Sequence, residues 1–163
     1  MKNLLLHYAA YNHWANQQLV KVLLKLKEEQ LDRDLGGGLS TLRAGVYYLW
    51  SAEYCWYERL QLTEKAADPS EGFEGTLADA CAEWLKQSLL LEKWVEKATL
   101  VKLDHTIAFT QKKSEHYKMP VQDVIMEMCN NSTFYRGQLV YMLEQLGVSR
   151  IPVISFGRFK PKK

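Results

Sequence analysis

The residues of this sequence that most readily bind metals or act as nucleophiles are four histidines and three cysteines. His7 and His13 are six residues apart, which places them on different faces of a helix. His105 and His116 lie in a later segment, where two strands could bring them together. The cysteines are far apart, odd in number and without a CxxC pair, so we expect no disulfide framework and no zinc knuckle. We interpret the histidines as scattered surface groups.

Long segments with helical periodicity must position these side chains. The first runs over residues 2–31, where apolar residues recur every three or four positions until a run of three glycines. A second helix is expected to begin near Ser40, and a polar loop over residues 63–75 follows it. A third helix is expected from Thr76, with Asp79 placed to form a capping box.

The last third of the chain predicts a different connection and a fourth helix. Residues 100–119 alternate with a period near two, which fits either a short hairpin or an extended crossover. Pro120 is a favoured first residue for the fourth helix, and Gly147 is its stop signal. Residues 148–163 form a C-terminal tail. The sequence therefore predicts an all-α fold, a four-helix bundle with a long crossover between helices three and four.

Length and charge limit the classes of protein that this chain can be. Its 163 residues suit one domain over residues 1–163, and the net charge of +2 gives no reason to expect a nucleic-acid partner. The sequence contains no run of about 18 apolar residues, so we expect no membrane span. The N-terminal apolar run is too short for a signal peptide, and we expect a cytoplasmic protein.

Three segments carry a resemblance to a known family: YNHWANQQLV at residues 11–20, STLRAGVYYLWSAEYCWYERL at residues 40–60 and NNSTFYRGQLVYMLEQLGV at residues 130–148. Their order, their spacing and the RGQ that precedes the helix end at LGV resemble the DinB-like family. The resemblance implies a bundle, commonly a homodimer, in which three histidines hold a divalent metal. Two of these histidines lie four residues apart on the last helix, and the third lies on the second helix. Characterised relatives include thiol-dependent S-transferases.

This sequence departs from the family pattern at all three histidine positions. Alignment on the RGQ places Asn131 and Tyr135 at the last-helix positions, and alignment of the second helix places Tyr48 at the third. A neutral phenol has a pKa near 10, and an amide oxygen binds zinc-type ions weakly. We therefore expect no metal and no other cofactor at these positions.

The three replacement side chains are expected to point into the bundle, where Asn131 and Tyr135 continue the apolar stripe of the last helix. Either they hydrogen-bond to one another and close the core, or they line a pocket for an organic ligand. The residues expected near such a pocket are Asn12, His13, Trp50, Glu53, Arg136 and Gln138. We expect Arg136 to reach a carboxylate or helix carbonyls, and Gly137 to allow close helix packing.

The resulting hypothesis is a DinB-like protein with a degenerate metal site that binds a small molecule or is a pseudoenzyme, in a homodimer. Two alternatives stay open. One is a metal- or thiol-dependent enzyme of the S-transferase type, which rests on family analogy alone. The other is a stress-response interaction protein that acts through its dimer face.

Overall fold

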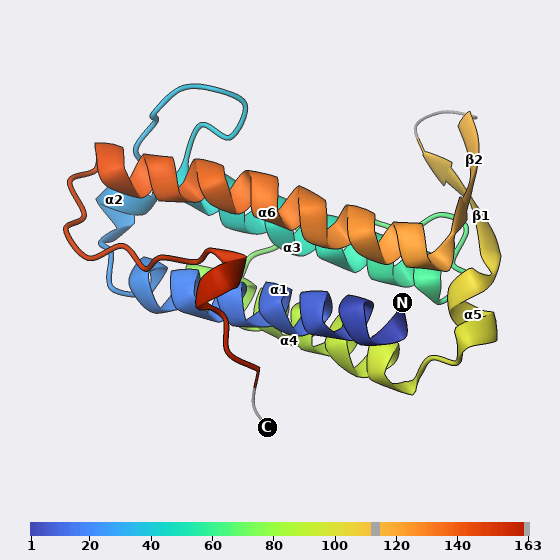
Figure 1. The fold of residues 1–163 in the computed structure, drawn as a ribbon. Helices are drawn as coiled ribbons and strands as arrows, with labels where there is room; N and C mark the ends of the chain where they lie inside the picture. Colours follow the sequence, from blue (N-terminus) through green and yellow to red (C-terminus); the bar gives the residue numbers. More distant parts are fainter. Residues whose placement is uncertain (112–114, 162–163) are drawn as a thin grey trace.

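Four long helices form the body of the protein, which we describe from a computed structural model over residues 1–111 and 115–161. They are α1 (Lys2–Leu23), α3 (Leu42–Leu60), α4 (Leu77–Lys97) and α6 (Val121–Gln145). Helix α1 packs against α4 and α6, and α3 packs against the same two helices. Helices α1 and α6 run in one direction and α3 and α4 in the other (Figure 1). The predicted four-helix bundle is confirmed.

Shorter elements lie in the connections and the tail. They are α2 (Glu28–Leu31), α5 (Leu100–Asp104), β1 (Thr106–Gln111), β2 (Glu115–Pro120) and the 3-10 turn η1 (Phe156–Arg158). The first helix is shorter than predicted, because α1 ends at Leu23 and α2 is a separate turn. The amides of Lys25 and Leu26 bond three residues back, which tightens and ends the last turn. No glycine or proline marks this break in the sequence, and the apolar periodicity continues across it. The sequence therefore predicted one long helix.

Local hydrogen bonds set the helix ends. The Thr41 hydroxyl accepts the backbone N–H three residues on, so Thr41 caps α3 and not the predicted Ser40. Thr76 and Asp79 form the predicted capping box of α4, with the Asp79 amide 3.2 Å from Thr76 Oγ1. Gly147 follows α6 at a φ of 72°, a conformation that glycine adopts without strain.

The connection between α4 and α6 contains the hairpin, one of the two predicted alternatives. Strands β1 and β2 pair antiparallel beyond the end of the bundle (Figure 1). The Phe109 side chain of β1 is buried, and its ring centroid lies 5.4 Å from that of Trp56 on α3. The register pairs His116 with Thr110, whereas His105 caps the end of α5, so the hairpin does not pair the two histidines.

The connection between α3 and α4 is long as well. Residues 61–76 run back beside α3, where Ser51 Oγ lies 2.9 Å from Ser70 Oγ. Farther along, the Phe73 ring packs edge-on against Trp50 at 5.0 Å. This return allows α3 and α4 to run parallel, as long connections do in other bundles.

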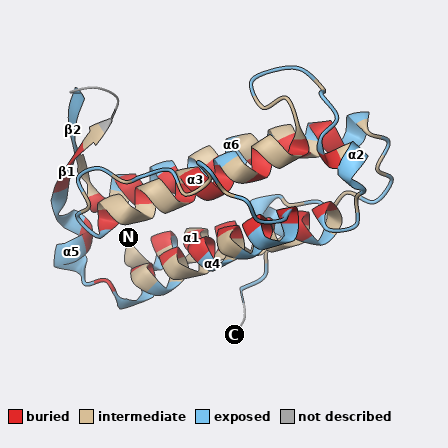
Figure 2. Ribbon diagram, turned by 180° about the vertical axis from the view of Figure 1, so that it is seen from behind, coloured by how far each residue is buried: buried red, intermediate tan, exposed pale blue. Residues whose placement is uncertain are grey.

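The core consists of two apolar clusters with a layer of polar side chains between them. One cluster surrounds Leu91 and Val124 near the hairpin, and the other surrounds Leu49 and Leu139 at the opposite end. Figure 2 shows the buried faces of the long helices turned toward one another. We call the residues between the clusters the polar layer: Asn12, Asn16, Glu53, Trp84, Ser132 and Arg136.

Glycine allows close helix packing at a position that the sequence patterns did not reveal. A Cβ added at Gly45 of α3 would lie 2.4 Å from Leu139 Cδ2 of α6. A Cβ at Gly137 would meet nothing within 4 Å, and Gly137 is exposed. The prediction for Gly137 is therefore wrong, because this glycine lies on the outer face of α6.

The outer face of α6 carries large apolar side chains. Met126, Phe134 and Tyr141 are 42%, 64% and 60% exposed and recur at helical spacing along one side. Over residues 1–111 and 115–161, none of the helices has the length and apolar character that a membrane crossing needs. The exposed apolar side chains of α6 form a stripe on a surface that also carries exposed polar side chains.

The C-terminal tail packs against the bundle. The Tyr11 hydroxyl donates to the carbonyl oxygen of Ile154 over 2.8 Å. Phe156 lies edge-on to the Tyr11 ring at 5.0 Å, and Phe159 lies 5.6 Å from the Trp14 ring. The prediction that the apolar part of the tail packs on the bundle agrees with these contacts, which extend to Phe159.

Candidate functional site

The three predicted site residues come from the antiparallel pair of helices α3 and α6. Tyr48 lies on α3, while Asn131 and Tyr135 lie one turn apart on the same side of α6. The rings of Tyr48 and Tyr135 are in contact, with centroids 4.1 Å apart and planes tilted by 47°. The two helices thus bring these positions together, as expected from the sequence.

The expectation that these side chains point into the bundle is wrong. Tyr48 is 36% exposed, and Asn131 and Tyr135 are half-buried at the surface. The row of α6 that enters the core is Ser132 and Arg136, each one residue later. Successive residues of a helix are rotated by about 100° around its axis. A prediction that is one residue off therefore places side chains in the core that lie at its border in the structure.

Tyr48 and Asn131 line a surface groove of about 300 Å³ between α3, α6 and the returning loop. The other polar or reactive residues in its wall are Ser51, Cys55, Arg59, Asp68 and Glu127. The Ser51 hydroxyl and the Ser70 backbone amide both donate to Asp68 Oδ1. Burial disfavours the Asp68 carboxylate, but these hydrogen bonds outweigh it and lower the pKa of Asp68 below its usual value. The loop therefore presents a fixed carboxylate to the groove.

A cation and a thiol line the same groove as this carboxylate. The Arg59 guanidinium carbon is 4.2 Å from the centroid of the Trp56 ring and 4.7 Å from that of Phe109. Such stacking holds the cation in place by attraction to the ring faces. Burial raises the pKa of Cys55, and the nearby Asp68 charge raises it further. Cys55 therefore remains a neutral thiol near pH 7, which is a poor nucleophile.

The donors at the three positions that the sequence resemblance assigns to histidines do not fit a zinc-type ion. Burial and the neighbouring Tyr135 raise the pKa of Tyr48 to about 12, so its phenol keeps its proton at neutral pH. Asn131 offers an amide oxygen, and Tyr135 offers a second phenol. Within the part of the chain that the structure describes, no group of three or more His, Cys, Asp and Glu side chains is arranged to hold a metal.

The polar layer centres on the carboxylate of Glu53, which is 1% exposed. Its Oε1 atom accepts four hydrogen bonds, from side chains of α1, α4 and α6. The donors and distances are Asn12 Nδ2 at 3.0 Å, Asn16 Nδ2 at 2.9 Å, Trp84 Nε1 at 3.1 Å and Ser132 Oγ at 2.9 Å. One oxygen therefore ties all four long helices together.

Arg136 completes this layer through the two asparagines. Its Nη1 donates to the side-chain oxygens of Asn12 and Asn16, and its Nη2 donates to Thr133 Oγ1 over 2.9 Å. The asparagine amides thus bridge the guanidinium and the carboxylate of Glu53. Arg136 was expected to reach a carboxylate or helix carbonyls, and that expectation is wrong because side-chain amides and a hydroxyl take its hydrogen bonds.

The charge of Glu53 is subject to opposing influences. Burial raises its pKa, whereas hydrogen bonds from Asn16, Asn12 and Trp84 and the charge of Arg136 lower it, with a net rise above the usual value. Glu53 Oε2 and Arg136 Nε are buried without a hydrogen-bond partner. Both belong to a layer that is closed on every side by packed helices.

The six expected neighbours of the pocket lie elsewhere. Asn12, Glu53 and Arg136 belong to the polar layer, and Trp50 is buried in the apolar cluster around Leu49. His13 lines a different groove, between α1 and α4. Gln138 is half-buried on α6 and lines neither groove.

Arg59, Asp68 and the role of Ser132 were not predicted from the sequence. No local motif marks Arg59 or Asp68, because a helix and a loop separated by several residues bring them together. Ser132 could have been found, since it lies four residues before Arg136. The signal is a pair of polar residues four positions apart on one face of a helix. Asn12 and Asn16 form such a pair on α1, where two amides interrupt an apolar stripe.

Comparison with known proteins agrees with this architecture. The sequence model described as the DinB family matches residues 1–159. Among proteins with curated descriptions, none matches the sequence.

Three solved bacterial structures share the fold at low sequence identity. A DinB-like protein from Bacillus cereus ATCC 10987 is 17% identical, with a TM-score of 0.69 over 88% of this chain and 90% of that one. YfiT from Bacillus subtilis, described as a probable metal-dependent hydrolase with an unusual four-helix bundle topology, is 13% identical, with a TM-score of 0.71 over 87% of each chain. The DinB-like protein YjoA from B. subtilis is 11% identical, with a TM-score of 0.66 over 93% of this chain and 97% of that one.

Proposed function

The chain belongs to the DinB family, and we propose that it binds a small polar organic molecule, and not a metal ion, in the α3–α6 groove. The observation that carries this proposal is the contact between Tyr48 and Tyr135 where the family resemblance places metal-binding histidines. The two helices bring these positions together, while their side chains lack the donors that a divalent metal needs.

The walls of the groove supply the polar contacts that an organic ligand needs. Asp68 and Glu127 offer carboxylates, and Arg59 offers a guanidinium held against aromatic rings. Tyr48 keeps its phenol proton and can donate it in a hydrogen bond. A few such groups around an open groove are typical of small-molecule sites. YfiT is described as a probable metal-dependent hydrolase, and the donors here argue against transferring that activity to this chain.

The proposal is tested by restoring the histidines. We expect the triple variant Tyr48→His, Asn131→His, Tyr135→His to bind about one zinc ion per chain, because i,i+4 imidazoles facing a third one form a zinc site. The matched control moves each histidine one residue back, to Tyr47, Asn130 and Phe134, and should bind none. If the triple variant also binds no zinc, these three positions are not the family site and the proposal fails.

A second copy of the chain is the partner that we propose for the outer face of α6. Met126, Phe134 and Tyr141 form an exposed apolar stripe, and Gly137 between the last two would let another helix approach. Sedimentation equilibrium should show a dimer for the wild-type chain and a monomer for Phe134→Ser/Tyr141→Ser. A wild-type monomer at high protein concentration would contradict this part of the proposal.

We also propose a cytoplasmic location. Its support is that Cys55, Cys81 and Cys129 are all unpaired in the structure. Free cysteines are typical of reducing compartments.

A further inference from the structure

The α3–α6 groove carries charges of both signs from three different elements. Arg59 lies near the end of α3, whereas Asp68 lies on the returning loop and Glu127 on α6. Within the part of the chain that the structure describes, no ion pair joins Arg59 to either carboxylate. The groove therefore offers a cation and two anions that the protein does not pair with one another.

The Arg59 guanidinium is held in place but keeps its hydrogen-bond donors available. It lies over the Trp56 and Phe109 rings, and contact with ring faces leaves the N–H groups in the guanidinium plane free to bind a carboxylate. No described residue accepts a hydrogen bond from this group. Burial lowers the pKa of Arg59, and no described carboxylate offsets this effect. A half-buried cation without such a partner favours an anionic group of a ligand.

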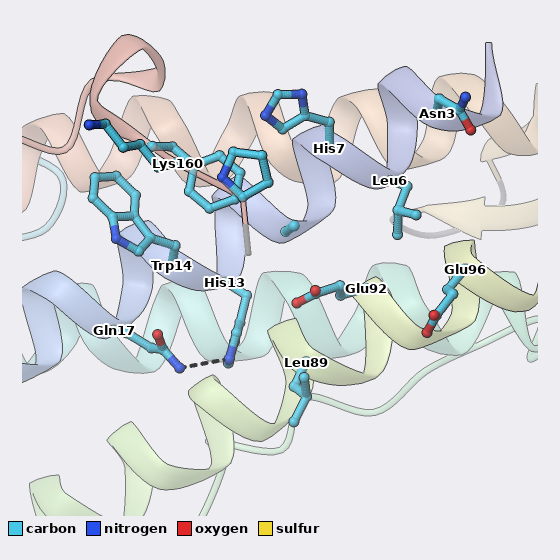
Figure 3. Close-up of a pocket in the computed structure, with 13 residues that line it drawn as sticks. Asn3, Leu6, His7, His13, Trp14, Gln17, Leu89, Glu92, Glu96 and Lys160 are labelled. Carbon is cyan, nitrogen blue, oxygen red and sulfur yellow. Dashed lines mark hydrogen bonds between the residues drawn. The ribbon is translucent and has the colours of Figure 1, made fainter. Parts of the chain in front are cut away.

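The groove between α1 and α4 differs in this respect. His13 extends from α1 toward α4, and its Nε2 lies 2.8 Å from the Gln17 side-chain nitrogen (Figure 3). Its Nδ1 lies 2.8 Å from Ser88 Oγ. The ring that could bind a ligand there is thus engaged within the protein, whereas the Arg59 guanidinium is not.

The carboxylates of the α3–α6 groove are also accessible. Asp68 is exposed, and its Oδ1 accepts hydrogen bonds from Ser51 and Ser70. No described residue donates a hydrogen bond to Asp68 Oδ2. Glu127 is exposed and makes no ion pair with any described residue. Two such carboxylates from different elements favour an ammonium group.

The positive and negative charges lie at different places along α3. Ser51, which holds Asp68, is eight residues before Arg59, or about 12 Å along the helix axis. Cys55 lies midway between Ser51 and Arg59 in the same row of the helix. Burial raises the pKa of Cys55, and the charges of Asp68 and Arg59 then act on it in opposite directions. The neutral thiol and the neighbouring Ala52 form an uncharged stretch between the two charges.

We propose that the α3–α6 groove binds a linear aminocarboxylate, with its carboxylate at Arg59 and its ammonium group at Asp68 and Glu127. The methylene chain between them lies over Ala52 and Cys55. The groove volume of about 300 Å³ suits a small molecule of this kind. This inference rests on the function proposed for the groove and names the class of its ligand.

Four probes with the same carbon chain test the two charges separately by isothermal titration calorimetry. They are 6-aminohexanoate with both charges, 6-aminohexanamide with the positive one, 6-acetamidohexanoate with the negative one and 6-acetamidohexanamide with neither. We expect 6-aminohexanoate to bind about tenfold more tightly than either singly charged probe, because each of these loses one charge-assisted interaction. The neutral probe should bind most weakly.

The outcomes separate this inference from the proposed function. Equal binding of the four probes that Tyr48→Ala abolishes would overturn the inference and leave the small-molecule function standing. Absence of 6-aminohexanoate binding would also overturn the inference. The proposed function fails separately, if the triple histidine variant takes up no zinc.

Variants on two helices locate the charges. Arg59→Gln should weaken the binding of 6-aminohexanoate about tenfold and leave that of 6-aminohexanamide unchanged. Glu127→Gln should weaken the binding of both amines about threefold, since Asp68 remains, and should not affect 6-acetamidohexanoate. A general loss of structure would not discriminate between the charges. The matched controls are Arg33→Gln and Glu144→Gln, which change exposed residues outside the groove and should leave all binding unchanged. An equal effect of Arg59→Gln on all four probes would overturn the assignment.

Labelling of Cys55 gives an independent test of the position. Cys81 and Cys129 are buried, so N-ethylmaleimide should react first with the half-buried Cys55. At about ten times its Kd, 6-aminohexanoate should slow this labelling about tenfold, because it then occupies most of the sites. Intact mass measured over time gives the rate. Unchanged labelling at a concentration that calorimetry shows to be saturating would overturn the proposed position.

Discussion

The polar layer and the α3–α6 groove use adjacent rows of the same helix for opposite purposes. On α6, Ser132 and Arg136 enter the bundle and are buried, while Asn131 and Tyr135 are half-buried; Asn131 lines the groove, and Tyr135 contacts its Tyr48. In the layer, hydrogen bonds within the protein join four helices, while Glu53 Oε2 and Arg136 Nε are buried without a partner. In the groove, Tyr48, Asp68 and Glu127 are exposed, so a ligand can replace the water around them. A rotation of about 100° per residue separates a structural role from the binding role that we propose.

The same comparison explains why burial of charge does not identify a binding site here. Glu53 and Arg136 are the most deeply buried charged groups, yet neither borders a groove. Their hydrogen bonds to Asn12 and Asn16 are made within the core. The layer should therefore control stability, and the groove should control binding.

The largest expected effect comes from breaking the layer. Arg136→Leu should lower the free energy of unfolding by about 3–5 kcal/mol, because it leaves the Glu53 charge buried without its compensating cation. Urea unfolding measures the change. Tyr135→Leu, one position earlier on α6, is the matched control and should cost under about 1 kcal/mol. Similar losses for the two variants would mean that the layer and the groove border do not differ as described.

The next effect concerns the two glycines. Gly45→Ala should destabilise the protein by about 1–3 kcal/mol, because the added methyl group would overlap the buried Leu139 side chain. Gly137→Ala should stabilise the monomer by up to about 1 kcal/mol, since alanine favours the helix and meets no neighbour there. Thermal melting of both variants at the same protein concentration checks the opposite signs. A loss of stability for Gly137→Ala that grows with protein concentration would agree with the proposed dimer, whereas a loss at every concentration would contradict the prediction for the monomer.

A smaller effect appears in the pH dependence of stability. Since burial raises the pKa of Glu53, the folded protein holds this proton more tightly than the unfolded chain. The stabilisation from protonation is complete below the unfolded pKa of about 4.3 and is lost as the pH rises through the folded value. Glu53→Gln removes this dependence. Relative to the variant, the wild type should therefore become less stable as the pH rises, as urea unfolding at about pH 4, 5.5 and 7 would show. A constant difference between the two proteins would contradict the raised pKa.

The smallest effect is expected in the groove. Tyr48→Phe removes one hydroxyl from an exposed side chain and should change the free energy of unfolding by no more than about 0.5 kcal/mol. Chemical denaturation of the variant beside the wild type checks this. A loss above about 2 kcal/mol would show that Tyr48 belongs to a structural hydrogen-bond network, and the groove would then resemble the layer.

Much of the fold could be predicted from the sequence, because local signals mark it. Thr76, Asp79 and Gly147 mark helix ends by their own hydrogen bonds and dihedral angles, and each is where it was predicted. The break after α1 carries no such signal. The course of residues 61–76 along α3 depends on contacts such as that of Phe73 with Trp50, which lie far apart in sequence.

The site was predicted less well, for a physical reason. Alignment on the RGQ and the apolar stripe of the last helix placed Tyr135 inside the bundle, whereas the buried residue is Arg136, one position later. In the structure, two asparagines on α1 accept hydrogen bonds from Nη1 of the guanidinium and Thr133 accepts one from Nη2, which makes its burial tolerable. A buried charge is accommodated by partners from other helices, which a single helical pattern does not reveal.

The most direct test of the central claim is the metal content of the untagged wild-type chain, purified without chelator and then offered zinc, nickel and manganese. With phenols and an amide at Tyr48, Asn131 and Tyr135, we predict a metal-to-chain ratio near zero by elemental analysis. A ratio near one would contradict this claim, because other side chains would then have formed a metal site, and the metal-dependent activity described for YfiT would become the leading hypothesis.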